Sequence, residues 1–176
     1  MQLLHGPTMV IGRRRDVPMV NRTLHLPDDV EHVALFEGKL HISAGIDYFA
    51  IAGNQYPWDL LPDMVIGRPG YDNFMVETAS LNNVSVVDAS KTIVALHQTD
   101  EEGVGSGHRR KDSSYNRRII ARHKASYRKH WNGCTRTDCT EYITKLTSTT
   151  ALSSNNLLMS EDRTKRAIVV ALRPCR

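Results

Sequence analysis

The stretch IGRPGYDNFMVETASLNNVSVVDASKTIVALHQTD, residues 66–100, predicts an α/β fold. Its first residues contain two glycines and a proline, which indicate a turn, and Asp72 stands where the N-cap of a helix belongs. About two turns of helix are predicted over 74–81. The runs 84–87 and 92–96 are rich in β-branched residues, so both are predicted to be strands. A loop, a helix and strands in this order are typical of α/β domains.

The sequence before this stretch continues the alternation of strands and helices. The apolar run 9–11 predicts a short buried strand. Apolar residues at helical spacing predict a helix over 28–37, with one of its first two aspartates as N-cap and the following glycine as its end. Residues 47–52 predict another strand. Residues 53–64 carry glycine, asparagine and two prolines, so they predict a loop or a single turn.

Charge is distributed unevenly along the 176 residues. The net charge of the chain is +4, yet residues 1–103 carry a net charge of −7 and residues 104–136 a net charge of +9. The hydrophobic fraction of 40% is sufficient for one domain with a core. We therefore expect an α/β unit over 1–103. Residues 104–176 are expected to form a basic loop, a helix and a Thr/Ser-rich tail that is poorly ordered.

Two elements are predicted within this second part. Residues 113–131 predict a helix whose buried side carries Ile119, Ile120 and Tyr127, and residues 166–174 predict a final strand. The basic stretch 108–136 also contains aromatic residues at Tyr115, Tyr127 and Trp131. Clustered cations attract phosphates and aromatic rings stack on bases, so this stretch predicts binding of nucleic acid or of a nucleotide diphosphate. A solvated basic surface is the alternative.

All three cysteines lie in the second part of the chain, at Cys134, Cys139 and Cys175. An odd count argues against a scaffold built on disulfides. A zinc site would need His123 and His130 to complete four ligands. Free thiols or one local disulfide are the favoured interpretations.

Asp72 and His97 are the candidate functional residues, and each has a structural alternative. Asp72 can simply cap a helix, and the same position lets a carboxylate accept a proton from a substrate hydroxyl. His97 follows the apolar run 92–96, which places it at the carboxyl end of a predicted strand, where open α/β sheets bind ligands. A neutral imidazole there can bind a metal ion, whereas a structural hydrogen bond is the commoner role. We expect Asp72 and His97 to open into one cleft.

Four short elements in order resemble nucleotide-diphospho-sugar glycosyltransferase-like proteins of GT-A type. They are Ile-Asp-Tyr-Phe at 46–49, Gly-Arg-Pro-Gly-Tyr-Asp-Asn at 67–73, Val-Asp-Ala at 87–89 and His-Gln at 97–98. The segment 9–17 is similar to the Val-Gly-x-Arg-x-Asp segment that precedes them in that family. The resemblance implies a partial GT-A, Rossmann-like mixed sheet with flanking helices. It implies transfer of a sugar from a nucleotide-diphosphate donor to a hydroxyl acceptor.

The resemblance also implies roles for individual residues. Asp72 would be the catalytic base that takes the acceptor proton. His97 would bind a divalent cation, Mn²⁺ or Mg²⁺, that holds the donor's diphosphate, and Arg68 would contact a phosphate. The acceptor would be bound by Asp47, Tyr48, Trp58, Tyr71 and Asn73.

One departure from the family pattern concerns the metal. GT-A donor sites hold the cation with an Asp-x-Asp motif, and no Asp-x-Asp occurs in this sequence. The chain is therefore expected to be the carboxyl-terminal, acceptor-side half of such a domain, incomplete and inactive alone. A non-catalytic remnant and a basic nucleic-acid-binding module are the alternatives.

Neither a membrane span nor a signal peptide is predicted. The longest apolar run, 167–172, is too short to cross a bilayer. The first residues, MQLLHGPTMVIGRRRD, lack a basic start followed by a long apolar block. A cytoplasmic location is the default expectation. The abrupt start is expected of a piece of a longer protein.

Overall fold

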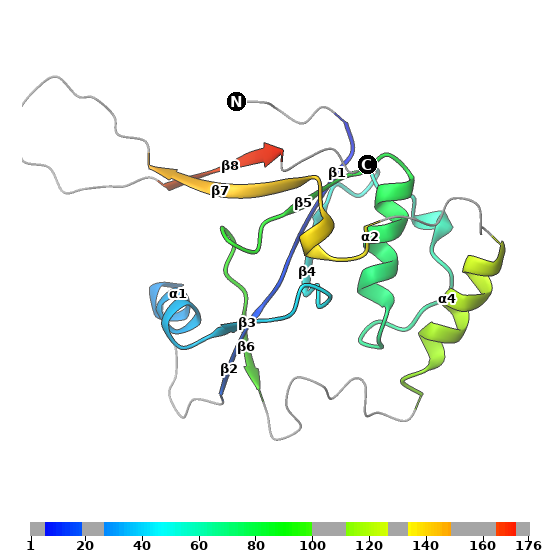
Figure 1. Ribbon diagram of the computed structural model, residues 1–176, viewed down its shortest axis with the longest axis horizontal. Coiled ribbons are helices and arrows are strands. Elements are labelled where there is room, and N and C mark those ends of the chain that lie inside the picture. Colours follow the sequence, from blue (N-terminus) through cyan, green and yellow to red (C-terminus); the bar gives the residue numbers. More distant parts are fainter. Residues whose placement is uncertain (1–5, 19–26, 100–111, 127–133, 149–164, 172–176) are drawn as a thin grey trace, which may run out of the picture.

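The structure is a computed structural model that describes residues 6–18, 27–99, 112–126, 134–148 and 165–171 (Figure 1). It is an α/β fold with two mixed sheets, so the predicted fold class is confirmed at this level. The sequence-based expectations for residues 104–111, 127–133 and 149–164, including Tyr127 and the poorly ordered tail, lie outside the described residues.

The larger sheet has five strands in the order β4-β1-β5-β7-β8. The central strands β1, β5 and β7 are parallel, and the edge strands β4 and β8 are antiparallel to their neighbours. The carboxyl ends of β1 and β5 therefore meet at one edge of the sheet. The bounds are β1 (Thr8–Gly12), β4 (Tyr48–Ile51), β5 (Ser85–Asp88), β7 (Tyr142–Ser148) and β8 (Lys165–Ala171).

The smaller sheet has the order β3-β2-β6, with β3 (Lys39–Leu40), β2 (Arg15–Pro18) and β6 (Leu96–Thr99). Only residues 13–14 separate β1 from β2, so one segment of chain leaves the first sheet and enters the second. Helix α1 (Pro27–Phe36) lies beside the smaller sheet (Figure 1).

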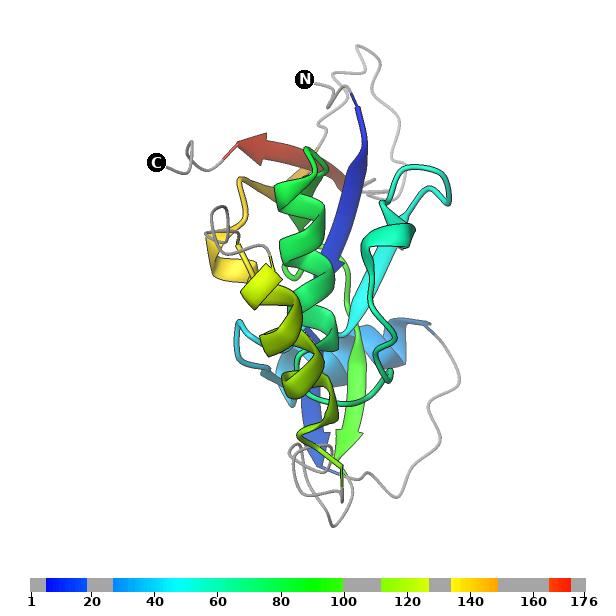
Figure 2. The same cartoon turned by 90° about the vertical axis from the view of Figure 1, so that its right-hand side faces the viewer.

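Two longer helices lie on one side of the larger sheet. Helix α2 (Tyr71–Leu81) covers a sheet face, and α4 (Tyr115–Ser126) lies on the side of α2 away from the sheet (Figures 1 and 2). Two short 3-10 helices, η1 (Trp58–Leu60) and η3 (Thr137–Cys139), lie in loops.

The core forms where α2 packs on the sheet. Met75, Val76 and Ala79 of α2 belong to one buried cluster with strand residues of β1 and β5, among them Met9, Ile11 and Val86. Each fully buried aliphatic side chain of this size contributes about 1.5–3 kcal/mol relative to exposure. The aliphatic packing of α2 therefore holds its amino terminus at a defined place on the sheet.

A buried amide attaches α4 to the loop before α2. Asn116 is completely buried, and its Nδ2 donates hydrogen bonds to the carbonyl oxygens of Val65 (2.9 Å) and Arg68 (3.1 Å). Its Oδ1 accepts a hydrogen bond from the Val65 N–H at 2.9 Å. Gly70 is left-handed (φ 93°), and an added Cβ would lie 2.8 Å from Cδ1 of Ile120. Glycine thus permits both the turn and the close approach of α4.

Three sequence-based boundaries are wrong. Gly70, not Asp72, is the N-cap of α2, because the left-handed glycine lets the helix begin at Tyr71 and leaves Asp72 in the first turn. Helix α1 begins at Pro27, a residue suited to a first helical position, so neither following aspartate is its cap. The strand predicted over 92–96 begins only at Leu96 and continues to Thr99 as β6, because the N–H groups of residues 92 and 93 turn back onto the carbonyl oxygen of Ala89.

The strands predicted at 9–11, 47–52, 84–87 and 166–174 are confirmed in β1, β4, β5 and β8, as is the helix that begins near residue 113. No strand was predicted at β7, whose residues YITKLTS are largely polar. Strand β7 pairs with β5, with Val87 opposite Tyr142. The composition of β7 alone does not indicate this pairing.

We expect Asn116→Ala to lower the free energy of unfolding by about 2 kcal/mol, because it leaves buried backbone groups of the 65–68 loop without partners. Urea denaturation would measure this loss. Asn54→Ala, the same substitution at an exposed position, is the control and should change stability by less than about 0.5 kcal/mol. Equal midpoints for the two variants would contradict the role of Asn116.

Candidate functional site

The candidate site lies at the carboxyl ends of β1 and β5. Helix α2 precedes β5 in the chain, and its first turn lies near the start of the loop 43–47 that leads into β4. We call the five polar residues Arg14, Asp16, His41, Asp47 and His97 the junction network, because they lie where the two sheets meet. Parallel α/β sheets bind ligands at this edge.

Asp16 is the centre of the junction network. Its Oδ1 accepts a hydrogen bond from Nε of Arg14 (2.8 Å) and lies 3.1 Å from Nδ1 of His97. Its Oδ2 lies 2.7 Å from Nδ1 of His41. Burial raises the pKa of Asp16, but the hydrogen bonds from Arg14 and His41 outweigh burial, so the net pKa is lowered. Asp16 is therefore an ionised structural acid.

Arg14 connects this acid to the other sheet. Its Nη1 donates to Oδ1 of Asp47 at 2.5 Å, and its backbone N–H donates to Oδ2 of Asp47 at 3.3 Å. Burial lowers the pKa of the Arg14 guanidinium, but its hydrogen bond with Asp16 and the charge of Asp47 raise it overall. Both carboxylates thus keep Arg14 charged.

Tyr48 packs closely on the end of β1. A Cβ on Gly12 would lie 1.8 Å from the Tyr48 hydroxyl oxygen, so only glycine leaves room for the ring. The hydroxyl donates to the carbonyl oxygen of Ile93 at 3.3 Å. Burial raises the pKa of Tyr48, and the nearby charge of Asp88 raises it further. Tyr48 therefore stays a neutral phenol.

Asp72 lies half-buried in the first turn of α2, and its Oδ2 accepts a hydrogen bond from the Ile46 N–H at 3.2 Å. Burial raises the pKa of Asp72, backbone hydrogen bonds from Ile46 and Asn73 lower it, and the charge of Asp47 raises it again. The net shift is upward. A carboxylate with a raised pKa binds a proton more readily than an exposed one, which suits a general base.

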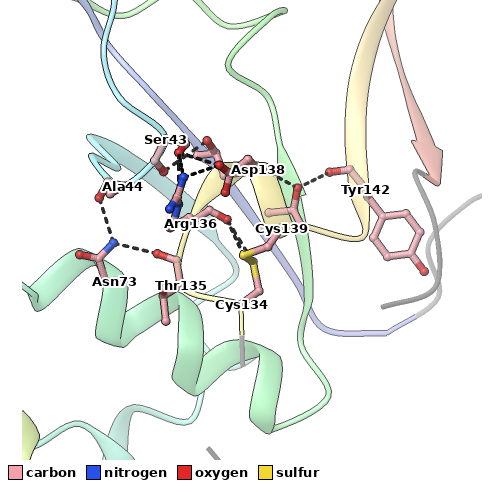
Figure 3. Close-up of a disulfide and its surroundings, with 11 residues drawn as sticks. Ser43, Ala44, Asn73, Cys134, Thr135, Arg136, Asp138, Cys139 and Tyr142 are labelled. Carbon is pink, nitrogen blue, oxygen red and sulfur yellow. Dashed lines mark hydrogen bonds and ion pairs between the residues drawn. A yellow bond between two sulfur atoms is a disulfide. The ribbon is translucent and has the colours of Figure 1, made fainter. Parts of the chain in front are cut away.

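The loop 134–139, which we call the disulfide loop, contacts helix α2 and the loop 43–47 (Figure 3). Cys134 and Cys139 are bonded to each other, which confirms the local disulfide among the alternatives and removes both cysteines from a zinc site. Asn73 Nδ2 donates to the carbonyl oxygens of Ala44 (2.9 Å) and Thr135 (2.8 Å). It therefore ties α2 to both the loop 43–47 and the disulfide loop.

Ser43 makes the remaining links to this loop (Figure 3). Its carbonyl oxygen accepts a hydrogen bond from the Thr137 N–H at 3.0 Å. Its hydroxyl oxygen accepts one from Nη2 of Arg136 at 2.6 Å, and its hydroxyl donates to Oδ2 of Asp138 at 2.8 Å. The loop 43–47 is thereby held between the disulfide loop and Asp72.

The structure brings some of the predicted residues together and not others. Asp47 and Tyr48 belong to the segment 43–48. Asp72 and Asn73 of α2 hydrogen-bond to the backbone of the same segment. His97 is not at the end of its strand but is the second residue of β6, opposite Asp16. Its Nδ1 lies 3.1 Å from Oδ1 of Asp16, a member of the junction network.

The remaining predicted residues make contacts of other kinds, although Tyr71 directly precedes Asp72 in α2. Trp58 follows β4, whose last residue pairs with the amino-terminal half of β1, and its Nε1 donates to the carbonyl oxygen of Gly53 at 2.8 Å. Arg68 contributes its carbonyl oxygen to Asn116, and Tyr71 packs against the core cluster. These contacts do not test the phosphate and acceptor roles expected of Arg68, Trp58 and Tyr71, which stay predictions.

Neither Asp72 nor His97 lines either of two pockets on the described residues. The larger, about 660 Å³, lies along α4. The smaller, about 230 Å³, is lined by Asn73 and Glu77 of α2 together with Arg136 of the disulfide loop. Neither of these two pockets tests the expected common cleft of Asp72 and His97, which stays a prediction.

Within the described part of the chain, no group of three or more His, Cys, Asp or Glu residues is placed to hold a metal ion. The residues most central to the network, Arg14, Asp16 and His41, were not predicted as site residues. The signal for the first two was present, because they are the Arg and Asp of the segment similar to Val-Gly-x-Arg-x-Asp. Nothing in the sequence indicated His41.

We expect Asp16→Asn to lower the free energy of unfolding at pH 7 by about 2 kcal/mol, since it weakens charged hydrogen bonds to Arg14 and His41. The folded-state pKa of Asp16 is lowered, so this stabilisation is present above the ordinary carboxyl pKa and is lost as pH falls. The difference in melting temperature between the native chain and Asp16→Asn should therefore decrease from pH 7 to pH 3. A constant difference across this range would contradict the assignment.

Reduction of the disulfide should loosen the loop 43–47. We expect Cys134→Ser with Cys139→Ser to cost about 2 kcal/mol of stability, the value for a short closed loop. Hydrogen exchange at the Thr137 N–H should accelerate, because this group bonds to Ser43. Dithiothreitol should not change the stability or the exchange rate of the double variant. It should change both quantities in the native chain toward the values of the double variant. Unchanged exchange in the reduced native chain would refute the link.

Comparison with known proteins found no matching family model, no matching curated protein and no matching solved structure. Among the described residues, no helix is both long enough and apolar enough to cross a membrane. The function of this chain must therefore be inferred from the chemistry of its site.

Proposed function

We propose that this chain is a glycosyltransferase-like protein that takes part in transfer of a sugar from a nucleotide-diphosphate donor to a hydroxyl acceptor. The observation that carries the proposal is the position of Asp72, a half-buried carboxylate with a raised pKa at the carboxyl edge of parallel strands. The order of the sequence elements resembling GT-A proteins supports the same assignment. We also propose that the chain is the acceptor-side half of a GT-A domain.

In the proposed reaction, Asp72 accepts the proton of the acceptor hydroxyl as its oxygen attacks the sugar. Burial raises the pKa of Asp72 and makes it a stronger base than an exposed carboxylate. Asp47 contributes its charge to that shift. Asn73 and the Ile46 N–H hold the first turn of α2 and the loop 43–47 in register, so that the base stays in position.

The proposed divalent cation, Mn²⁺ or Mg²⁺, would stabilise negative charge on the departing diphosphate. The described residues do not fit such an ion, because no three of their His, Cys, Asp or Glu side chains are grouped to hold it. No step is therefore assigned to a metal held by these residues. The contacts of Arg68 and Trp58 likewise leave their phosphate and acceptor roles as predictions.

The Cys134–Cys139 disulfide bears on where the reaction would occur. Disulfides persist in oxidising compartments and are rare in the cytosol. We therefore propose an oxidising compartment in place of the cytoplasmic default.

We expect Asp72→Asn to reduce sugar transfer at least about 100-fold, the contribution of a general base. The assay, on the longest natural version of the protein, would follow release of nucleoside diphosphate from UDP- and GDP-sugars with Mn²⁺ and a panel of hydroxyl acceptors. In the native chain the rate should rise with pH through the raised pKa of Asp72, because only the ionised form accepts a proton. Asn removes a charge that burial disfavours, so the melting temperature at pH 7 should stay the same or increase.

The matched control is Asp59→Asn, which makes the same substitution at an exposed aspartate. It should leave transfer unchanged. Equal turnover in Asp72→Asn and the native chain would refute the catalytic role. Absence of turnover in the native chain with every donor would favour the non-catalytic alternative.

A further inference from the structure

The larger pocket is a groove lined by residues of helix α4 and by Pro62 and Asp63. Helix α4 lies on the side of α2 that faces away from the larger sheet (Figures 1 and 2). Its volume of about 660 Å³ is that of a ligand site. The lining residues from α4 are Tyr115, Arg118, Ile119, Arg122 and His123. None of these residues belongs to the candidate site at the junction of the sheets.

The groove is predominantly basic. Helix α4, YNRRIIARHKAS, contains no acidic residue, and the lining includes two arginines against one acid, Asp63. Arg118 and Arg122 are four residues apart, so they project from the same side of the helix. Burial lowers the pKa of His123, which leaves the arginines as the positive charges of α4 in the groove at neutral pH.

An exposed aromatic residue lies beside these charges. Tyr115 lines the groove, and 38% of its surface is accessible. Proteins that bind single-stranded nucleic acid combine a positive groove with aromatic side chains on which bases stack. A site for an isolated phosphate does not require an aromatic residue.

We propose that this groove binds single-stranded nucleic acid, with Arg118 and Arg122 contacting phosphates and Tyr115 stacking on a base. The surrounding sequence favours a polyanion over one small diphosphate, because α4 lies within residues 104–136, whose net charge is +9. Arginine suits this role, since its planar guanidinium makes paired hydrogen bonds to phosphate oxygens. The proposal uses no residue of the junction network and is independent of sugar transfer.

The test is the binding of a fluorescein-labelled single strand of about 16 nucleotides, within the range of known site sizes. Fluorescence anisotropy would be recorded at a series of salt concentrations. Arg118→Gln with Arg122→Gln should weaken binding at least about tenfold. It should also reduce the slope of log K against log salt by about 1.4, because each phosphate contact on a single strand contributes about 0.7. Tyr115→Ala should weaken binding with little change in that slope.

The matched control is Lys39→Gln with Lys145→Gln, which removes the same two charges at exposed positions outside the groove. It should bind much as the native chain does, and circular dichroism would confirm that both double variants are folded. Equal affinities of the two double variants would overturn the proposal. Displacement of the strand by micromolar pyrophosphate would also overturn it and identify a small diphosphate as the ligand.

Discussion

The structure depends on one charged contact, the Arg14 guanidinium held between the carboxylates of Asp16 and Asp47. Asp16 belongs to the smaller sheet, and Asp47 immediately precedes an edge strand of the larger one. A partly buried arginine is stable only when its charge is compensated, and two acids supply that compensation from two sides. The orientation of one sheet relative to the other is therefore coupled to the ionisation of these groups.

The loop 43–47 connects this charged contact to Asp72 through hydrogen bonds. The Asp47 N–H donates to the carbonyl oxygen of Gly12 at 2.9 Å, and the preceding residue, Ile46, donates to Asp72. The disulfide loop holds the other side of the same segment through Ser43 and Asn73. A loop fixed at several points can present a carboxylate in one geometry, as a general base requires. The site is therefore more rigid than its location in a loop region suggests.

Helix α4 has a different relation to the fold. Its contacts with the rest of the fold include the buried amide of Asn116, Ile120 beside Gly70 and an edge-on ring contact of His123 with Phe74, while its arginines line an outer groove. Packing explains the buried side of α4, and no packing requirement explains the absence of acids from its whole length. The basic character of α4 is thus a property of its surface. This separation lets the two proposals succeed or fail independently.

The sequence by itself determined the α/β class, the helix after Gly70, the strands β1, β4, β5 and β8 and the basic character of 104–136, because these follow from local periodicity and composition. It also drew attention to Asp72 and Asp47. Only the tertiary structure decided that His97 faces Asp16, that His41 joins them and that β7 pairs with β5. These contacts join residues 25 to 81 positions apart, or strands whose own composition is polar. Local sequence carries no signal for such pairings, since they arise only when separate elements pack together.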